Sequence, residues 1–179
     1  MSHAEVRIRH AAQREISEIE DVCVAAYAEY RSEVPVSVFE GYINDLRRLS
    51  DHWHEAEVLV ADVGGRIGGS VLFYADASTE GLGLPKGWSG FRKLAVHPRT
   101  RGLGLGRSLT RACIDSARRQ HASTVGIHTV SFMRAARHIY EQMGFRRCVE
   151  FDISASDMGL GDAGGDVNII AYRLDFVSA

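Results

Sequence analysis

The spacing of apolar residues predicts an alternation of strands and helices that begins at the N-terminus. Val6 and Ile8 alternate with arginines, which is typical of a short strand. Apolar residues then recur at helical spacing from Ile16, which predicts a first helix. A second helix is expected to begin near Ser37, because Ser37 and Glu40 form a capping-box pair.

The middle of the chain predicts three strands. Residues 57–63 and 66–74 are rich in β-branched and aromatic residues, and Gly64 and Gly65 join them as a tight hairpin. A glycine-rich connection leads to a further strand over residues 91–96.

The C-terminal half predicts two more helices and three more elements of strand type. One helix carries Leu109 and Cys113 on its apolar face, and the other ends at Gly144, which stands where a C-terminal cap belongs. The strands are residues 123–130, 148–153 and 167–176. The order βααβββαβαββ predicts an α/β (α+β) fold, a mixed and largely antiparallel sheet flanked by helices, in one domain over residues 1–179.

Composition narrows the class of protein. The chain has 179 residues, 45% hydrophobic and 25% charged, with a formal net charge of -2, which is typical of a globular domain and not of a general nucleic-acid binder. No apolar run is long enough to span a membrane, and the N-terminus is charged where a signal peptide is apolar, so we expect a cytoplasmic protein. Cys23, Cys113 and Cys148 each fall within an apolar stretch and show no paired spacing, so we expect buried free thiols. A cysteine nucleophile is the alternative, for which no partner residue is indicated.

The segment RTRGLGLGRSLTRA, residues 99–112, suggests a phosphate site. A P-loop requires Lys after its last glycine, whereas Arg107 follows Gly106, and Arg101 stands where the first glycine belongs. The dinucleotide pattern G-x-G-x-x-G is not matched either. Glycines that merely permit a tight turn are one alternative. Free backbone N–H groups at the start of a helix, which bind phosphate without a lysine, are the reading that we favour.

Two segments together resemble the Gcn5-related N-acetyltransferases. In LAVHPRTRGLGLGRSLTRA, Arg101, Gly104 and Gly106 match the family's (Arg or Gln)-x-x-Gly-x-(Gly or Ala) motif after a strand that ends Val-x-Pro. AARHIYEQMGF is similar to the family's A-x-x-x-Y-x-x-x-GF segment, with Tyr140 in register. The element order also matches the family fold from about residue 6 to residue 176.

The resemblance implies an acyltransferase that uses acetyl-coenzyme A (acetyl-CoA) as co-substrate. Residues 102–108 would hold the pyrophosphate, while residues 94–96 and 128–130 would flank the pantetheine arm and the thioester, with the Val96 N–H or its neighbour as oxyanion donor. Among the helix arginines, only Arg107 is assigned to the coenzyme. The coenzyme-binding residues implied are Leu94, Ala95, Val96, Arg101, Gly102, Leu103, Gly104, Leu105, Gly106, Arg107 and Ser108.

The resemblance implies that Tyr140 donates a proton to the leaving thiolate, the alternative being an aromatic residue at the edge of the core. Many relatives carry a glutamate that acts as the general base at the position of Gly90. Glycine has no side chain and cannot act as a base. His128, with an ordinary pKa near 6.5, is our candidate base. The alternatives are Glu80, His97 or a water chain, and a hydrogen-bonded strand histidine is the alternative role for His128. His97 precedes a proline, which favours a structural role.

Two further features carry little chemistry. Met133 stands where the family often has an asparagine that contacts the coenzyme, and methionine cannot make those hydrogen bonds. His52 and His54 would share one face of an extended segment as a metal pair, but no further ligand is near them in sequence. Acetyl transfer requires no metal, and we expect none.

The acceptor pocket implied by the resemblance lies between the first two helices and the last loop. Tyr27 and Tyr30 are the candidate substrate residues. Other aromatic residues of this region are Phe39, Tyr42 and Trp53, and acids of the last loop are Asp157, Asp162 and Asp166. We expect direct transfer to a small primary amine in a ternary complex, by a monomer or homodimer. The alternatives are a protein or peptide amine, an acyl-CoA sensor without a base, and a nucleotide-binding enzyme.

Overall fold

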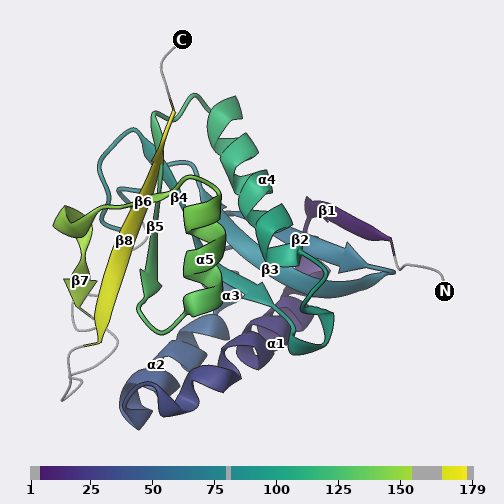
Figure 1. Ribbon diagram of the computed structural model, residues 1–179. Coiled ribbons are helices and arrows are strands. Elements are labelled where there is room, and N and C mark those ends of the chain that lie inside the picture. The colour runs from purple at the N-terminus through teal and green to yellow at the C-terminus, as the bar shows by residue number, and fades with distance from the viewer. Residues whose placement is uncertain (1–4, 80–81, 155–166, 177–179) are drawn as a thin grey trace.

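The computed structural model describes residues 5–79, 82–154 and 167–176, and it confirms a mixed α/β fold (Figure 1). The helices are α1 (Ile16–Tyr27), α2 (Val36–Leu46), α3 (Leu49–His52), α4 (Leu105–Arg119) and α5 (Arg134–Gln142). The strands are β1 (Val6–His10), β2 (Glu57–Val63), β3 (Arg66–Tyr74), β4 (Trp88–Val96), β5 (Thr124–Val130), β6 (Arg146–Arg147), β7 (Ile153–Ser154) and β8 (Asn168–Asp175).

The strands form one sheet in the order β1-β2-β3-β4-β5-β8-β6, and β7 pairs with β8. Every described pairing is antiparallel except that of β4 with β5, which run parallel. This one parallel pair is short: residues Trp88 to Gly90 of β4 face Thr124 to Gly126 of β5. Beyond that point no pairing joins the two described strands, so the sheet is open between them (Figure 1).

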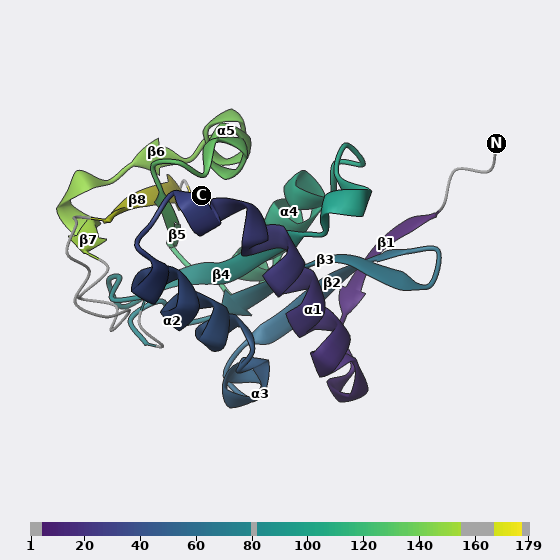
Figure 2. The ribbon, with the colours of Figure 1, turned by 90° about the horizontal axis from the view of Figure 1, so that it is seen from below.

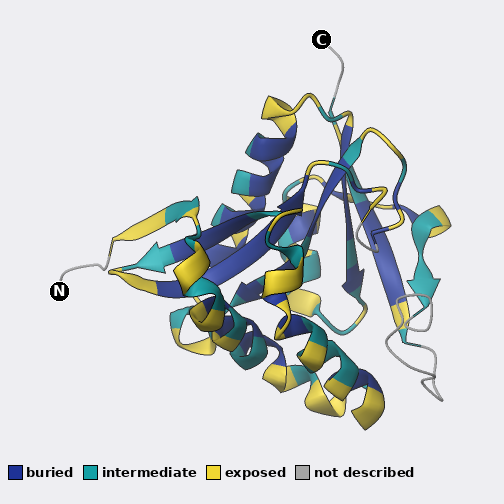
Figure 3. Ribbon diagram, turned by 180° about the vertical axis from the view of Figure 1, so that it is seen from behind, coloured by how far each residue is buried: buried dark blue, intermediate teal, exposed yellow. Residues whose placement is uncertain are grey.

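Helices cover both faces of the sheet. Figure 2 shows α1, α2 and α3 on one face and α4 and α5 on the other. One apolar cluster joins α1, including Ile19 and Cys23, to the first face, and a second joins α4, including Leu109 and Cys113, to the opposite face. Figure 3 shows the result, with buried residues along the central strands and exposed residues on the outer surfaces of the helices.

The amphipathic pattern of α4 explains why it lies where it does. Leu105, Leu109, Cys113 and Ala117 recur every fourth residue, and all four are buried at 1% exposure or less. Burying a leucine side chain contributes about 1.5–3 kcal/mol relative to leaving it in water. This stripe therefore fixes the start of α4, and with it the glycine loop, against β3 and β4.

The second helix begins near Ser37, as predicted, but the capping box that indicated this start does not form. α2 begins at Val36, one residue before Ser37, and its N-cap is Pro35, which makes no side-chain capping bond. The restricted φ of proline, here -53°, directs the chain into the first turn without a capping side chain. Ser37 is therefore a helical residue and caps nothing.

The predicted strand over residues 148–153 is also wrong. A 3-10 turn, Val149–Phe151, replaces most of it and separates the short strands β6 and β7. Val149 is 67% exposed, so this segment does not bury the alternating face that a strand would need. Leu49, which the apolar stripe assigns to the second helix, instead begins the separate short helix α3, and β4 begins at Trp88 instead of residue 91.

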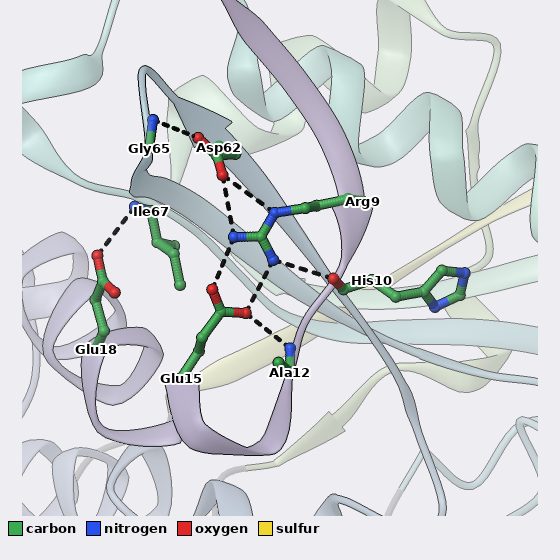
Figure 4. A network of polar contacts seen from close by, with 8 residues as sticks. All are labelled: Arg9, His10, Ala12, Glu15, Glu18, Asp62, Gly65 and Ile67. Carbon is green, nitrogen blue, oxygen red and sulfur yellow. Dashed lines mark hydrogen bonds and ion pairs between the residues drawn. The ribbon is translucent and has the colours of Figure 1, made fainter.

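Arg9 connects β1 to the 3-10 turn that precedes α1, Gln13–Glu15, and to β2 (Figure 4). Its Nη2 atom lies 2.7 Å from Oε1 of Glu15 and 3.0 Å from Oδ2 of Asp62. Glu15 also accepts the Ala12 N–H at 2.7 Å, and Asp62 accepts the Gly65 N–H of the hairpin at 2.7 Å. The hydrogen bonds from Arg9 lower the pKa of Glu15 to about 2.

The cysteines are free and buried, as the sequence predicts. Burial raises the pKa of the Cys23 thiol to about 11 and that of Cys113 well above its ordinary value, so neither is a thiolate at neutral pH. Among the residues described, no helix has the length and apolar character that crossing a membrane requires.

Candidate active site

A cavity of about 810 Å³ opens where β4 and β5 part. Its lining combines residues from both faces of the sheet: Tyr27 and Tyr42 pack with the cluster on the α1 face, whereas Ile139 and Tyr140 pack with the cluster on the α4 face. The glycine loop before α4 lines the same cavity. The opening in the sheet therefore connects the loop with the aromatic residues of the first two helices.

An irregularity in β4 sets the edge of this opening. Arg92 lies opposite Leu72 and Ala95 lies opposite Ser70, so β4 has one residue more than β3 between these pairs. Such an extra residue is a β-bulge, which leaves the ladder unpaired locally and bends the strand. Lys93, inside the bulge, has a φ of 53°, in the left-handed region that side chains other than glycine rarely adopt.

The bulge decides which backbone groups face the opening. The His97 N–H donates to the Gly68 carbonyl at 2.9 Å, so His97 is directed toward β3. Backbone groups alternate along a strand, and those of Leu94 and Val96 are therefore directed toward the open edge. The Tyr27 hydroxyl donates to the Leu94 carbonyl at 3.1 Å, which attaches α1 to this edge. Without the extra residue, the opposite set of backbone groups would face the opening.

In the predicted phosphate loop, two glycines adopt the left-handed backbone conformation that residues with a side chain rarely adopt. Gly102 and Gly104 have φ values of 81° and 73°, and Gly104 is the N-cap of α4 without a capping side chain. The first intrahelical N–H is that of Ser108, which donates to Gly104, so the preceding N–H groups of the helix have no intrahelical acceptor. A Cβ on Gly106 would lie 3.1 Å from Ile139, so this glycine permits close packing of α4 on α5.

The two arginines assigned to the coenzyme contact protein groups. Both terminal nitrogens of Arg101 lie 2.8 Å from the carboxylate of Glu29, in the 3-10 turn that follows α1, and one donates to the Ala26 carbonyl of α1 at 3.4 Å. Arg107 donates to the Gln142 side chain of α5. Leu103 is 52% exposed at the tip of the loop. The loop is thus attached to α1 on one side and to α5 on the other.

Tyr140 lies in α5 with its ring in the core and lines the cavity. It is 4% exposed and packs edge-on against Phe91, with ring centroids 5.8 Å apart, and at 5.7 Å from Phe145. Burial raises the pKa of its hydroxyl well above the usual value of a tyrosine. The hydroxyl is therefore protonated at neutral pH and can act as a donor.

His128 lies on β5 and lines the cavity from the other strand. Its Nε2 atom is 2.9 Å from the Phe151 carbonyl, which can only accept, so Nε2 carries the proton and Nδ1 has the lone pair. Nδ1 is buried and has no hydrogen-bond partner among the described residues. Burial lowers the pKa of the imidazole, which favours the neutral form that a base requires.

The structure explains why position 90 is occupied by glycine. A Cβ at this position would lie 2.8 Å from the Gly126 carbonyl on β5 and 3.3 Å from Ala77. Gly126 is equally restricted, because its Cβ would lie 2.5 Å from the side chain of Leu84. The short parallel pairing of β4 with β5 therefore depends on two glycines that face each other, and no glutamate fits there.

Of the other candidate bases, His97 is the one whose structure is described. His97 accepts the Arg99 N–H on Nδ1 at 3.1 Å and caps a 3-10 turn, Pro98–Thr100, which is a structural contact. Glu80 lies outside the described residues, as do Asp157, Asp162 and Asp166 of the last loop. The water chain is not tested by the structure.

Four aromatic rings form one wall of the cavity. The Tyr27 ring lies 6.0 Å from Tyr30 and 5.1 Å from Tyr42, and Tyr30 lies 5.4 Å from Phe132. Both predicted substrate residues, Tyr27 and Tyr30, belong to this wall. Phe132 escaped the sequence prediction, because it follows β5 and reaches the tyrosines of α1 only through the folded chain. Trp53 packs in the core behind them.

Two charged side chains that line the cavity, Glu29 and Lys93, are held in ion pairs. Glu29 is held by Arg101, and the Nζ atom of Lys93 lies 3.1 Å from Oδ2 of Asp45. Met133 lines the cavity and accepts a long contact from the Thr129 hydroxyl at 3.7 Å. Within the described part of the chain, no group of three or more His, Cys, Asp or Glu residues could hold a metal ion.

The fold thus places a cavity between two parted strands, with a glycine loop at one end. The family model described as the acetyltransferase (GNAT) family matches residues 20–145. The chain belongs to this family and is an acyltransferase of the GNAT type. A comparison with curated proteins found no match.

Solved structures show the same fold at low identity. The YncA protein of Salmonella typhimurium, described with its cofactor acetyl-CoA, is 20% identical, with a TM-score of 0.69 over 98% of this chain and 96% of that one. The PaiA N-acetyltransferase of Thermoplasma acidophilum, in complex with coenzyme A, is 10% identical, with a TM-score of 0.70 over 96% and 99%. The ribosomal-protein-S18-alanine N-acetyltransferase of Escherichia coli is 16% identical, with a TM-score of 0.68 over 98% and 96%.

Proposed function

We propose that residues 1–179 act as one domain that transfers an acetyl group from acetyl-CoA to a small primary amine. The single observation that carries this proposal is the cavity between β4 and β5, which joins the glycine loop to an aromatic wall. A nucleotide-binding enzyme would need neither the parted strands nor a wall beyond them. Two of the solved structures with this fold are described with acetyl-CoA or coenzyme A, which supports the choice of co-substrate.

The coenzyme would be held at two places. The N–H groups at the start of α4 and the positive end of its dipole would bind the pyrophosphate, because residues 102–108 carry no acid and Gly104 leaves the backbone uncovered. The open edge at residues 94–96 would pair with the pantetheine arm through main-chain hydrogen bonds, as a strand adds to a sheet. The Val96 N–H is the proposed donor to the carbonyl oxygen of the thioester.

The transfer itself is a direct displacement. The amine nitrogen forms a bond to the thioester carbonyl carbon, and the carbon–sulfur bond then breaks. The amine loses one proton and the departing thiolate gains one, so the reaction needs one acceptor and one donor of protons. Acetyl transfer therefore requires no redox partner and no metal.

Tyr140 and His128 are the proposed donor and acceptor. Tyr140 packs with the cluster on the α4 face, whereas Phe151, which His128 contacts, packs with the cluster on the α1 face. The two groups thus reach the cavity from opposite faces of the sheet. The amine would approach from the aromatic wall on the α1 face, and the thiolate would leave on the face where Tyr140 lies.

The acceptor that this wall favours is a compact amine with an apolar or aromatic body. Tyr27 and Tyr30 supply ring faces for such a body, and the one carboxylate among the described lining residues, Glu29, is already bound to Arg101. The wall thus offers little to a long cationic chain.

A second candidate function is an acyl-CoA sensor, which the glycine at position 90 favours. Such a protein would bind acetyl-CoA and release no thiol with any amine. An amine panel beside lysine- and alanine-terminated peptides, with coenzyme release as the readout, tests both functions. We expect turnover with small amines. Turnover with peptides alone would contradict the acceptor class, and tight binding without turnover would identify a sensor.

A further inference from the structure

The bulge in β4 contains a buried lysine. The chain has only two lysines among its 21 basic residues of lysine and arginine type, Lys86 and Lys93. Lys86 is exposed, whereas the side chain of Lys93 is 2% exposed. A buried ammonium is costly, and a positive φ in a residue with a side chain adds strain. Both costs fall on one residue that lines the cavity.

Lys93 is held by one residue of α2. Its Nζ atom donates to the main-chain carbonyl of Asp45 at 2.8 Å and lies 3.1 Å from the Asp45 carboxylate. Nε2 of His52 lies 3.8 Å from the other carboxylate oxygen. Burial alone would raise the pKa of Asp45, but His52 and Lys93 together lower it to about 2. Asp45 is therefore ionised at neutral pH and matches the ammonium.

The contact between Lys93 and Asp45 connects two sides of the cavity, the open edge of β4 and the aromatic wall. On β4, Lys93 directly precedes Leu94, whose backbone faces the open edge because of the bulge. On α2, Asp45 lies one turn beyond Tyr42, which belongs to the aromatic wall. A shift of α2 would therefore move the wall and release the bulge together.

We propose that Lys93 and Asp45 are positioning residues for acetyl transfer, and that their ion pair holds the β4 bulge against α2. This inference rests on the proposed function. The pair keeps the N–H groups of Leu94 and Val96 directed at the thioester and fixes the distance from that edge to the aromatic wall. Neither side chain exchanges a proton or forms a bond with substrate.

The test compares Lys93→Met and Asp45→Asn with the parent, and Lys86→Met is the matched control on the other lysine. We expect kcat to fall at least tenfold in the first two variants and the Kd of acetyl-CoA to rise at least fivefold. The Kd of 3′-phospho-ADP should stay within twofold, because this fragment of the coenzyme ends before the pantetheine arm. The double variant should lose no more than either single one, and Lys86→Met should match the parent.

General damage to the fold would weaken the fragment and acetyl-CoA in parallel, and that result would overturn the positioning role. Values of kcat and of the acetyl-CoA Kd within twofold of the parent in Lys93→Met would overturn it as well. If the parent is active and the Lys93 and Asp45 variants are as active as the parent, this inference is refuted and the proposed function stands. A parent that neither binds nor consumes acetyl-CoA refutes the proposed function and this inference with it.

The two lysines also allow a readout that needs no acceptor. Labelling lysine at ¹³Cε gives one resonance for Lys86 and one for Lys93. Acetyl-CoA should shift the Lys93 resonance, the 3′-phospho-ADP fragment should not, and Lys86 should respond to neither. A Lys93 resonance that ignores saturating acetyl-CoA would contradict the coupling between the bulge and the thioester.

Discussion

At the scale of single residues, Tyr140 is the group whose hydroxyl can be removed most cleanly. Tyr140→Phe keeps the packing against Phe91 and deletes only the proposed proton donor. We expect kcat to fall about 10²-fold, since general acid catalysis contributes about 10²–10⁴-fold. Steady-state release of thiol measures the rate, and calorimetry should show an acetyl-CoA affinity close to that of the parent.

Tyr74→Phe is the matched control for this prediction. Tyr74 is buried at 2% exposure, as Tyr140 is at 4%, but it does not line the cavity. We expect its kcat to equal that of the parent. Equal rates for Tyr140→Phe and the parent would contradict the proton-donor role and leave Tyr140 as a packing residue.

His128 makes a prediction about pH. Burial and the charge of Arg92 lower the pKa of His128, while Phe151 and Asp152 oppose this. Only the neutral imidazole accepts a proton, so kcat/KM should rise with pH through a midpoint below about 6.5, the ordinary value for histidine. His128→Ala should remove this rise of kcat/KM with pH and lower the rate at least tenfold. His138 is exposed, and His138→Ala should keep the pH dependence and the rate of the parent. A rise with the same midpoint in His128→Ala would assign it to another group.

At the scale of elements, the proposed phosphate site before α4 depends on the backbone conformation of the glycine loop. Gly104 has a φ of 73°, and no atom lies within 4 Å of a Cβ placed there. Gly104→Ala therefore introduces left-handed strain of about 1–2 kcal/mol without a clash. Relief of this strain should displace the N–H groups of the loop, and we expect the Kd of acetyl-CoA to rise at least tenfold by calorimetry.

Gly65→Ala supplies the same strain away from the cavity. Gly65 lies in the β2–β3 hairpin with a φ of 87° and an equally open Cβ position. Both variants should lose similar stability to urea, and only Gly104→Ala should lose affinity for acetyl-CoA. A parallel loss of affinity in both would mean that the loop responds to stability alone.

The connection between β1, the first turn and β2 depends on Arg9 and Glu15. The folded pKa of Glu15 is about 2, lowered from 4.5 by Arg9, so its stabilisation is complete above about pH 4.5 and is lost as the pH falls through about 2. Glu15→Gln should cost about 1–2 kcal/mol at pH 7, with allowance for partial solvent screening.

Urea unfolding at pH 7 and near pH 2 measures this effect, and the difference between Glu15→Gln and the parent should shrink at the lower pH. The exposed pair of Arg48 and Asp51 provides a comparison, and Asp51→Asn should change stability by less than about 0.5 kcal/mol. A difference for Glu15→Gln that is the same at both pH values would contradict the role of its ionised carboxylate.

At the scale of the whole molecule, local sequence signals predicted the parts that local physics determines. Apolar periodicity predicted α1, α4 and α5, and Gly64–Gly65 predicted the hairpin. The glycine loop and Tyr140 indicate the family from the sequence alone. The capping box at Ser37 failed, because Pro35 starts α2 by its own restricted φ.

The remaining features depend on contacts between distant segments. The bulge at Lys93 follows from the register of β4 on β3, which nothing in residues 91–96 reveals. Its partner Asp45 is 48 residues away. The packing that excludes a glutamate at Gly90 needs Gly126 on another strand. Pairings of this kind arise only from the folded sheet, so the sequence of one segment does not reveal them.

Calorimetric titration of the protein with acetyl-CoA, beside ATP and NAD at the same concentrations, tests the central claim most directly. We predict one acetyl-CoA bound per chain, with an affinity that Gly104→Ala lowers at least tenfold, and no comparable heat from ATP or NAD. Binding of ATP or NAD in place of acetyl-CoA, or acetyl-CoA binding that Gly104→Ala leaves unchanged, would contradict it.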